Sequence, residues 1–168
     1  SRDWSSDVCS SDLRKRTELE KSVPDLEGFL KQLDLRVLIK SANDFTIPRI
    51  SQLTLKTNQF NLTTKRYQES DIKKFAQDKD YLVGCAQVED KFGDNGITGV
   101  FIVNKKNPKE WYLDTFLLSC RVMGREVEKG ILSYVIGKAK ESGAQQLRAQ
   151  FVPTLKNKPV EDFLPKCG

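Results

Sequence analysis

Three apolar segments follow one another with short connections, and this run constrains the fold more than any other feature. The segments span residues 81–88, 97–103 and 111–118. The first connection, at 92–96, holds two glycines, and the second, at 104–109, holds a proline. Strands joined by turns this short pair antiparallel, because a parallel pair needs a crossover of about a dozen residues or more. The sequence therefore predicts an antiparallel meander at the centre of the fold.

Helical patterns and two further strand candidates flank this meander. Residues 126–142 carry apolar side chains at spacings of three and four and end before Gly143, which is typical of an amphipathic helix. The segment 56–64 is dense in amide and hydroxyl side chains and is expected to form a loop. Other helices are expected at 14–33, 46–55, 71–77 and 159–166, and other strands at 35–39 and 147–152. This order predicts a single mixed α/β domain.

Composition excludes several functional classes. The 168 residues include no histidine, so no Ser-His-Asp or Cys-His pair can form within the chain. The four cysteines are far apart, which argues against a zinc site, and no metal is expected. No apolar run reaches the roughly 18 residues of a membrane span, and free thiols favour a cytoplasmic location. The net charge of +5 suits an acidic partner or an anionic ligand, while no motif predicts nucleic-acid binding.

The stretch 119–130 carries the strongest chemical signal. It lies between a predicted strand and the amphipathic helix, and Gly124 is placed to make the turn. A helix start presents backbone N–H groups and a positive dipole end, which hold phosphate groups. We predict that a phosphopantetheine-type ligand, on an acyl carrier protein or in CoA, binds Leu118, Ser119, Arg121, Val122, Gly124 and Arg125. The alternative is that the arginines are surface residues and the glycine a simple turn.

Catalytic and substrate-binding candidates follow from the same reasoning. Cys120, beside an arginine and a helix start, is either an acyl-accepting thiol or a buried small side chain. Without histidine, a general base would be a carboxylate such as Asp114 or Asp94. An aspartate in a turn such as Asp94 more often stabilises the turn itself. Backbone N–H groups near residues 117–119 are expected to stabilise a thioester oxyanion. Three amides either line a pocket for substrate hydroxyls or satisfy a loop backbone: Asn58, Gln59 and Asn61.

The element order, with a glycine-bearing loop between the fourth strand and third helix, resembles the GNAT acyltransferase fold. Residues 121–125 resemble the R/Q-x-x-G-x-G/A loop that holds the acyl-carrier pyrophosphate. Asn157, followed by Leu164 and Gly168, has the spacing of the terminal motif N-x-x-A…Y-x-x-x-G, which implies that Asn157 contacts the cofactor. Two positions depart from the pattern. Glu126 stands where glycine or alanine is usual, and Leu164 stands where a tyrosine general acid is usual.

Longer strings at 56–67, 91–94 and 114–128 look like the C-terminal half of FkbH-like proteins. In that family a haloacid-dehalogenase-type phosphatase domain precedes a GNAT-like domain. The two are associated with loading a glyceryl unit, derived from a phosphorylated glycerate, onto an acyl carrier protein in polyketide biosynthesis. The resemblance implies acyl transfer to the carrier's phosphopantetheine thiol. The alternatives are a non-catalytic docking module for the carrier and an N-acetyltransferase that uses acetyl-CoA.

The resemblance also predicts the domain organisation. Residues 34–168 are expected to form the GNAT-like domain, truncated at its C-terminus. Residues 14–33 are expected to be a helical linker or the tail of a missing phosphatase-type domain. Residues 1–13 repeat Ser-Ser-Asp and resemble sequencing-adapter read-through, so they are expected to be a non-native leader.

Overall fold

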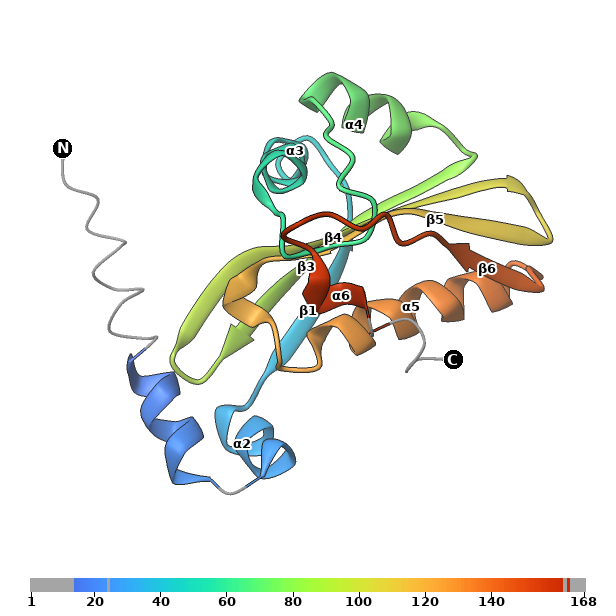
Figure 1. Ribbon diagram of the computed structural model, residues 1–168. Coiled ribbons are helices and arrows are strands. Elements are labelled where there is room, and N and C mark those ends of the chain that lie inside the picture. The colour runs from blue at the N-terminus through green and yellow to red at the C-terminus, as the bar shows by residue number, and fades with distance from the viewer. Residues whose placement is uncertain (1–13, 24, 162, 164–168) are drawn as a thin grey trace, which may run out of the picture.

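A mixed sheet forms the centre of the computed structural model, which describes residues 14–23, 25–161 and 163 (Figure 1). Four long strands lie in the order β1, β3, β4, β5, and two short strands, β2 and β6, both pair with β5. All pairs are antiparallel except β5 with β6. The strands are β1 (Arg36–Ser41), β2 (Phe60–Asn61), β3 (Tyr81–Asp90), β4 (Gly93–Asn107), β5 (Glu110–Leu118) and β6 (Gln146–Ala149). The predicted meander is confirmed as β3–β5.

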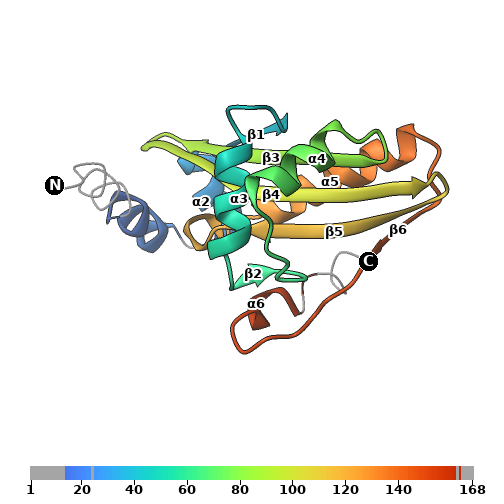
Figure 2. The same ribbon diagram turned by 90° about the horizontal axis from the view of Figure 1, so that it is seen from above.

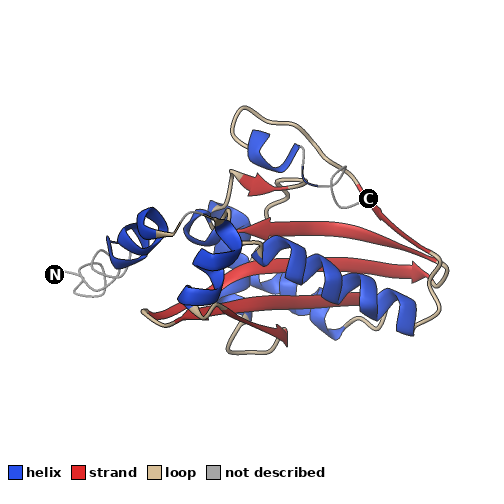
Figure 3. Ribbon diagram, turned by 90° about the horizontal axis from the view of Figure 1, so that it is seen from below, coloured by secondary structure: helices blue, strands red, loops and turns tan. Residues whose placement is uncertain are grey.

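Helices cover both faces of the sheet, as Figure 2 shows from above. On one face Val100 and Ile102 of β4 pack with α3 (Ile47–Lys56) and α4 (Glu69–Gln77). On the other face Phe101 and Val103 pack with α5 (Val127–Glu141), which lies along the strands in Figure 3. A sheet buried on both faces needs continuous apolar runs, which is why the three central strands are visible in the sequence. The predicted fold class, a largely antiparallel mixed sheet flanked by helices, is confirmed.

The edge of β5 is shared between two partners. Its first half pairs with β6, from Glu110 with Gln146 to Leu113 with Ala149. Its second half pairs with β2, and Leu62 extends this pairing by donating its N–H to the carbonyl of Phe116 (3.1 Å). The partners change at a β-bulge, because Ile102 faces Thr115 and Val103 faces Leu113, which leaves Asp114 as the extra residue.

Three sequence predictions are wrong in position. The β3–β4 turn is Lys91–Phe92, not 92–96, because Asp90 accepts the N–H of Phe92 (2.9 Å) and closes the chain earlier. β2 forms inside the predicted loop 56–64, because the edge of β5 supplies it with backbone partners. β6 ends at Ala149 rather than at residue 152, since the chain then turns toward Leu62.

The N-terminal helices pack against the rest of the molecule. Residues 14–22 are helical, and α2 (Leu26–Leu33) follows with Asp25 as its N-cap, so the predicted helix at 14–33 is broken. Arg16 pairs with Asp90 through two contacts of 2.5 and 2.9 Å, and Phe29 is buried. That residues 14–33 are a linker or the tail of a missing phosphatase-type domain stays a prediction.

Both ends of the chain lie outside the described residues. The predicted leader at 1–13 is therefore not described. The terminal motif positions Leu164 and Gly168, which follow α6 (Lys158–Glu161), are not described either. Within the described part of the chain, no helix combines the length and apolar character needed to cross a membrane.

Candidate functional site

The C-terminal end of β5 opens into a pocket of about 710 Å³, which we name the Cys120 pocket. The thiol of Cys120 is exposed there, whereas Cys85 is buried in the sheet. Three chain segments form the walls: the end of β5, α3 with the loop after it, and the chain after β6. The lining residues are Arg49, Leu53, Lys56, Thr57, Asn58, Gln59, Leu118, Ser119, Cys120, Leu155 and Lys156. The structure thus brings Cys120, Leu118 and Ser119 together with the predicted substrate amides Asn58 and Gln59.

The lining of the Cys120 pocket is positively charged. Arg49, Lys56 and Lys156 line it, and no carboxylate does. The Arg49 guanidinium is held by the carbonyl of Ile97 (3.3 Å) and by the side chain of Gln52. Burial lowers the pKa of Arg49, and the nearby charge of Arg121 lowers it further. Like charges gathered in one pocket attract an anionic ligand.

Sequence reasoning did not select these three basic residues. Lysines are usually solvated, and Arg49 sits on a helix with no motif around it. Arg49 and Lys156 are 107 residues apart, so only the folded chain shows that they share a pocket.

Hydrogen bonds fix the wall that carries the predicted amides. The Arg66 guanidinium donates to the carbonyls of Thr54 and Thr57 and to the side-chain oxygen of Asn58. The nitrogen of Asn58 donates to the carbonyl of Lys56 (3.2 Å), so both ends of this amide already have partners. Gln59 is exposed, and its side chain makes no hydrogen bond to any described residue. Of the two lining amides, Gln59 is therefore the one available to a ligand.

Two further predicted amides lie inside the wall instead of lining the pocket. Asn61 is fully buried, donates to Thr57 (3.1 Å) and accepts from Thr64 (3.0 Å). Asn157 is also fully buried. Its side chain donates to the carbonyls of Val152 (2.7 Å) and Asn61 (3.1 Å) and accepts the N–H of Thr154 (2.7 Å). These bonds join the two walls, which suits a supporting role better than ligand contact.

Most of the loop predicted to hold phosphate, residues 121–126, does not line the Cys120 pocket. The turn Cys120–Val122 uses its own amides, since Val122 donates to Ser119 (3.1 Å) and Met123 donates to Cys120 (3.4 Å). The Ser119 N–H donates to Thr98 (2.7 Å), so it is not free to stabilise an oxyanion. Val122 is buried.

The residues that follow this turn also lie away from the Cys120 pocket. Gly124 makes the predicted turn, with a φ of 78° that suits glycine. The Arg125 guanidinium lies 4.8 Å from the Phe29 ring centroid, against the N-terminal helices. Glu126 precedes α5 in the left-handed conformation and pairs with Lys129 (3.2 Å).

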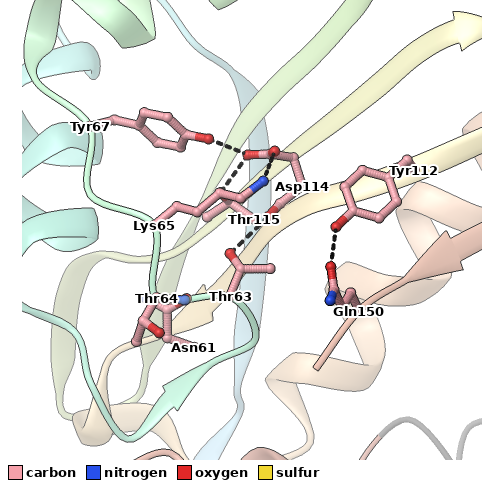
Figure 4. Close-up of polar contacts among 9 residues, drawn as sticks. All are labelled: Asn61, Thr63, Thr64, Lys65, Tyr67, Tyr112, Asp114, Thr115 and Gln150. Carbon is pink, nitrogen blue, oxygen red and sulfur yellow. Dashed lines mark hydrogen bonds and ion pairs between the residues drawn. The ribbon is translucent and has the colours of Figure 1, made fainter. Parts of the chain in front are cut away.

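Asp114 belongs to a separate polar network (Figure 4). Its carboxylate accepts from Lys65 (2.6 Å), Tyr67 (2.7 Å) and Thr115 (3.0 Å), and its carbonyl accepts from Thr63 (2.9 Å). Burial and the Asp114 carboxylate raise the pKa of Tyr67, which keeps the phenol protonated as a donor. Asp114 precedes Leu118 by four residues, roughly 13 Å along a strand, so its side chain does not reach the Cys120 pocket.

Asp94, the other carboxylate considered as a base, is hydrogen-bonded to residues of β3 and β4 near the turn. It accepts from the Gln87 side chain (2.6 Å) and from the N–H of Gly96 (2.7 Å). No group of three or more cysteine, aspartate or glutamate side chains able to hold a metal ion occurs among the described residues.

Comparison of the coordinates with solved structures supports the fold. The ribosomal-protein-S18-alanine N-acetyltransferase from Escherichia coli is 14% identical with a TM-score of 0.60, over 79% of this chain and 77% of that one. Rv2747 from Mycobacterium tuberculosis, solved in complex with CoA, is 14% identical with a TM-score of 0.60, over 78% of this chain and 70% of that one. A GNAT family acetyltransferase from Staphylococcus aureus is 15% identical with a TM-score of 0.51, over 70% and 87%.

These comparisons show that the chain has the GNAT fold. No protein-family model matches the sequence, and a search of curated proteins gives no match. Because the identities are low, the similarity establishes the architecture and leaves the chemistry to the site.

Proposed function

We propose that this GNAT-fold domain is an acyltransferase that binds an acyl thioester of the CoA or phosphopantetheine type in the Cys120 pocket. One observation carries the proposal: an exposed thiol lies in a pocket with three basic side chains and no carboxylate. Thiols are the side chains best suited to exchange acyl groups with thioesters. The cationic lining fits the phosphate of such a ligand, and the fold is shared with a protein solved with CoA.

The residues divide the work as follows. The Cys120 sulfur forms a bond to the acyl carbon, while the leaving group of the donor departs with the thiol proton. The acceptor thiol then attacks the same carbon and returns its proton to Cys120, so no other reactant is needed. Gln59 is placed to hydrogen-bond hydroxyl groups of the acyl unit. Arg49, Lys56 and Lys156 hold the anionic part of the ligand.

The resemblance to FkbH-like proteins refines the proposal. The acyl unit is then a glyceryl-type group, the acceptor is the phosphopantetheine thiol of an acyl carrier protein, and a phosphatase-type domain acts with this one. Lys56 and Lys156, the exposed lysines that line the pocket, also suit the acidic surface that such a carrier would bring.

Mass measurement of the intact protein tests the acyltransferase. After incubation with a glyceryl thioester, we expect an adduct with the mass of one acyl group on the peptide that contains Cys120. Adding unloaded carrier protein should discharge it. Cys120→Ala should form no adduct and transfer at least about 100-fold more slowly. Full transfer by this variant would remove the covalent role.

An amine N-acetyltransferase is the second candidate, because a structurally similar protein is an alanine N-acetyltransferase. It predicts direct transfer from acetyl-CoA to an amine with no adduct and no dependence on Cys120. Glu126 and Leu164 depart from the residues that such chemistry uses in the GNAT pattern. A docking module without catalysis predicts salt-sensitive carrier binding and no transfer.

A further inference from the structure

The phosphate loop expected from the sequence is poorly suited to an anion in this chain. Glu126 and Glu128 place two carboxylates at the start of α5, and one Glu128 oxygen is buried with no hydrogen-bond partner in the described structure. Arg125 faces Phe29 of α2 instead of the Cys120 pocket. A phosphate placed at this helix start would meet these two carboxylates.

The lining of the Cys120 pocket has the properties that the loop lacks. Arg49 is half-buried and oriented by two hydrogen bonds, so little side-chain entropy is lost when it binds. Lys56, at the end of α3, and Lys156, after β6, are both exposed and line the pocket. No carboxylate of the described residues forms an ion pair with Arg49, Lys56 or Lys156.

Some other cations of the described residues do form ion pairs, but the Cys120 pocket gathers three basic side chains without one. Arg16 pairs with Asp90, Arg36 with Asp34 and Arg148 with Glu110. Three unpaired cations around one exposed thiol repel one another, and an anion bound among them relieves that repulsion.

We propose that the phosphate nearest the thiol end of the ligand is bound by Arg49, Lys56 and Lys156, and not by Arg125 and the start of α5. Arg49 is the fixed contact, and the two exposed lysines add their charges to the same pocket. The ligand class is a pantetheine 4′-phosphate group, in CoA or on a carrier protein. The inference rests on the proposed function in taking this ligand as a thiol carrier, but it requires no acyl transfer.

Protection of Cys120 from alkylation tests this site. Cys9 and Cys167, which lie outside the described residues, are replaced by serine, and Cys85 is buried. Iodoacetamide labelling is followed with pantetheine, pantetheine 4′-phosphate or CoA present, each as its S-methyl thioether so that the ligand does not consume the reagent. Pantetheine 4′-phosphate should protect at a concentration about tenfold lower than pantetheine. CoA should protect within about threefold of pantetheine 4′-phosphate, because the pocket contacts only the first phosphate.

Matched variants locate the phosphate. Arg49→Gln should abolish most of the tenfold advantage of the phosphate, while Lys56→Gln and Lys156→Gln should each reduce it about threefold. Arg36→Gln, an exposed arginine on β1 at the far edge of the sheet, is the charge-matched control and should change nothing. A second readout is iodoacetate, whose anionic charge should speed its reaction relative to iodoacetamide in the parent protein but less so in Arg49→Gln.

The outcomes separate this inference from the proposed function. Equal protection by pantetheine with and without phosphate overturns the site, as does an Arg49→Gln variant that behaves like Arg36→Gln. If the phosphate effect disappears in Arg125→Gln instead, the phosphate is bound by the loop that contains Arg125 and the proposal is wrong. Phosphate-dependent protection without any acyl adduct supports the site and rejects covalent acyl transfer through Cys120.

Discussion

Two polar regions lie along β5, and they differ in how their charges are paired. Around the bulge, the Asp114 carboxylate has three donors, and neighbouring bonds join the loop 57–67 to the chain after β6. We name this region the polar scaffold: Asn61, Thr63, Lys65, Tyr67, Asp114, Thr115 and Asn157. At the end of the strand, the Cys120 pocket gathers cations without carboxylates among its lining residues.

The difference separates support from binding. A polar group whose partners lie within the chain stabilises the fold, and its loss leaves those partners unsatisfied. A cluster of like charges adds little to stability and is maintained at some electrostatic cost, so its benefit comes from a ligand. Substitutions in the polar scaffold should therefore lower stability, whereas substitutions in the pocket should lower binding.

The largest stability effect is expected at Asn157. Asn157→Ala leaves two carbonyls and one N–H inside the wall without their partner. The free energy of unfolding should fall by about 3 kcal/mol, measured by urea denaturation. A loss below about 1 kcal/mol would mean that the walls are held in another way.

Asp114→Asn should have the next largest effect. The variant keeps the shape of the side chain but loses its charge, which weakens the bonds from Lys65 and Tyr67. We expect a loss of about 2 kcal/mol in the same assay, because Asp114 is mostly buried. Acyl transfer per folded molecule should stay within about threefold. A 100-fold fall with unchanged stability would instead support Asp114 as the general base predicted from the sequence.

Glu128 is an unpaired charge outside both regions. Burial raises the pKa of its carboxyl above the ordinary 4.5, so the folded chain binds this proton more tightly than the unfolded chain. Stability is therefore lost as the pH rises from about 4.5 through the folded pKa. Glu128→Gln should add about 1 kcal/mol at pH 7, and the gain should vanish below about pH 4. Thermal unfolding at both pH values measures it, and a constant gain would contradict the cause.

The smallest stability effects are expected for the pocket lysines. Lys56→Gln and Lys156→Gln should each change the free energy of unfolding by less than about 0.5 kcal/mol, because both side chains are exposed and unpaired. A loss above about 1 kcal/mol in either variant would place that lysine in the scaffold and weaken the contrast.

The sequence predicted the parts of this molecule that depend on local pattern. The apolar runs of β3–β5 and the spacing along α5 are properties of continuous segments, and both elements are confirmed. β2 has two residues and leaves no periodic signal, so its place beside β5 depends on tertiary structure. The same holds for Asp114, whose bulge requires knowledge of the β4–β5 register.

The candidate site was predictable only in part for the same reason. The strand-to-helix junction pointed to Ser119 and Cys120, and the amide-rich loop pointed to Asn58 and Gln59, which line one pocket. The direction of a side chain was not predictable. Arg125 turns to Phe29 because α2 packs beside the loop, and an aromatic face attracts a guanidinium.

A crystal structure with pantetheine 4′-phosphate bound tests the central claim most directly. We predict the phosphate within about 4 Å of the Arg49 guanidinium, with the pantetheine thiol beside the Cys120 sulfur. A phosphate bound at the start of α5, or a ligand that leaves the Cys120 pocket empty, would contradict the account.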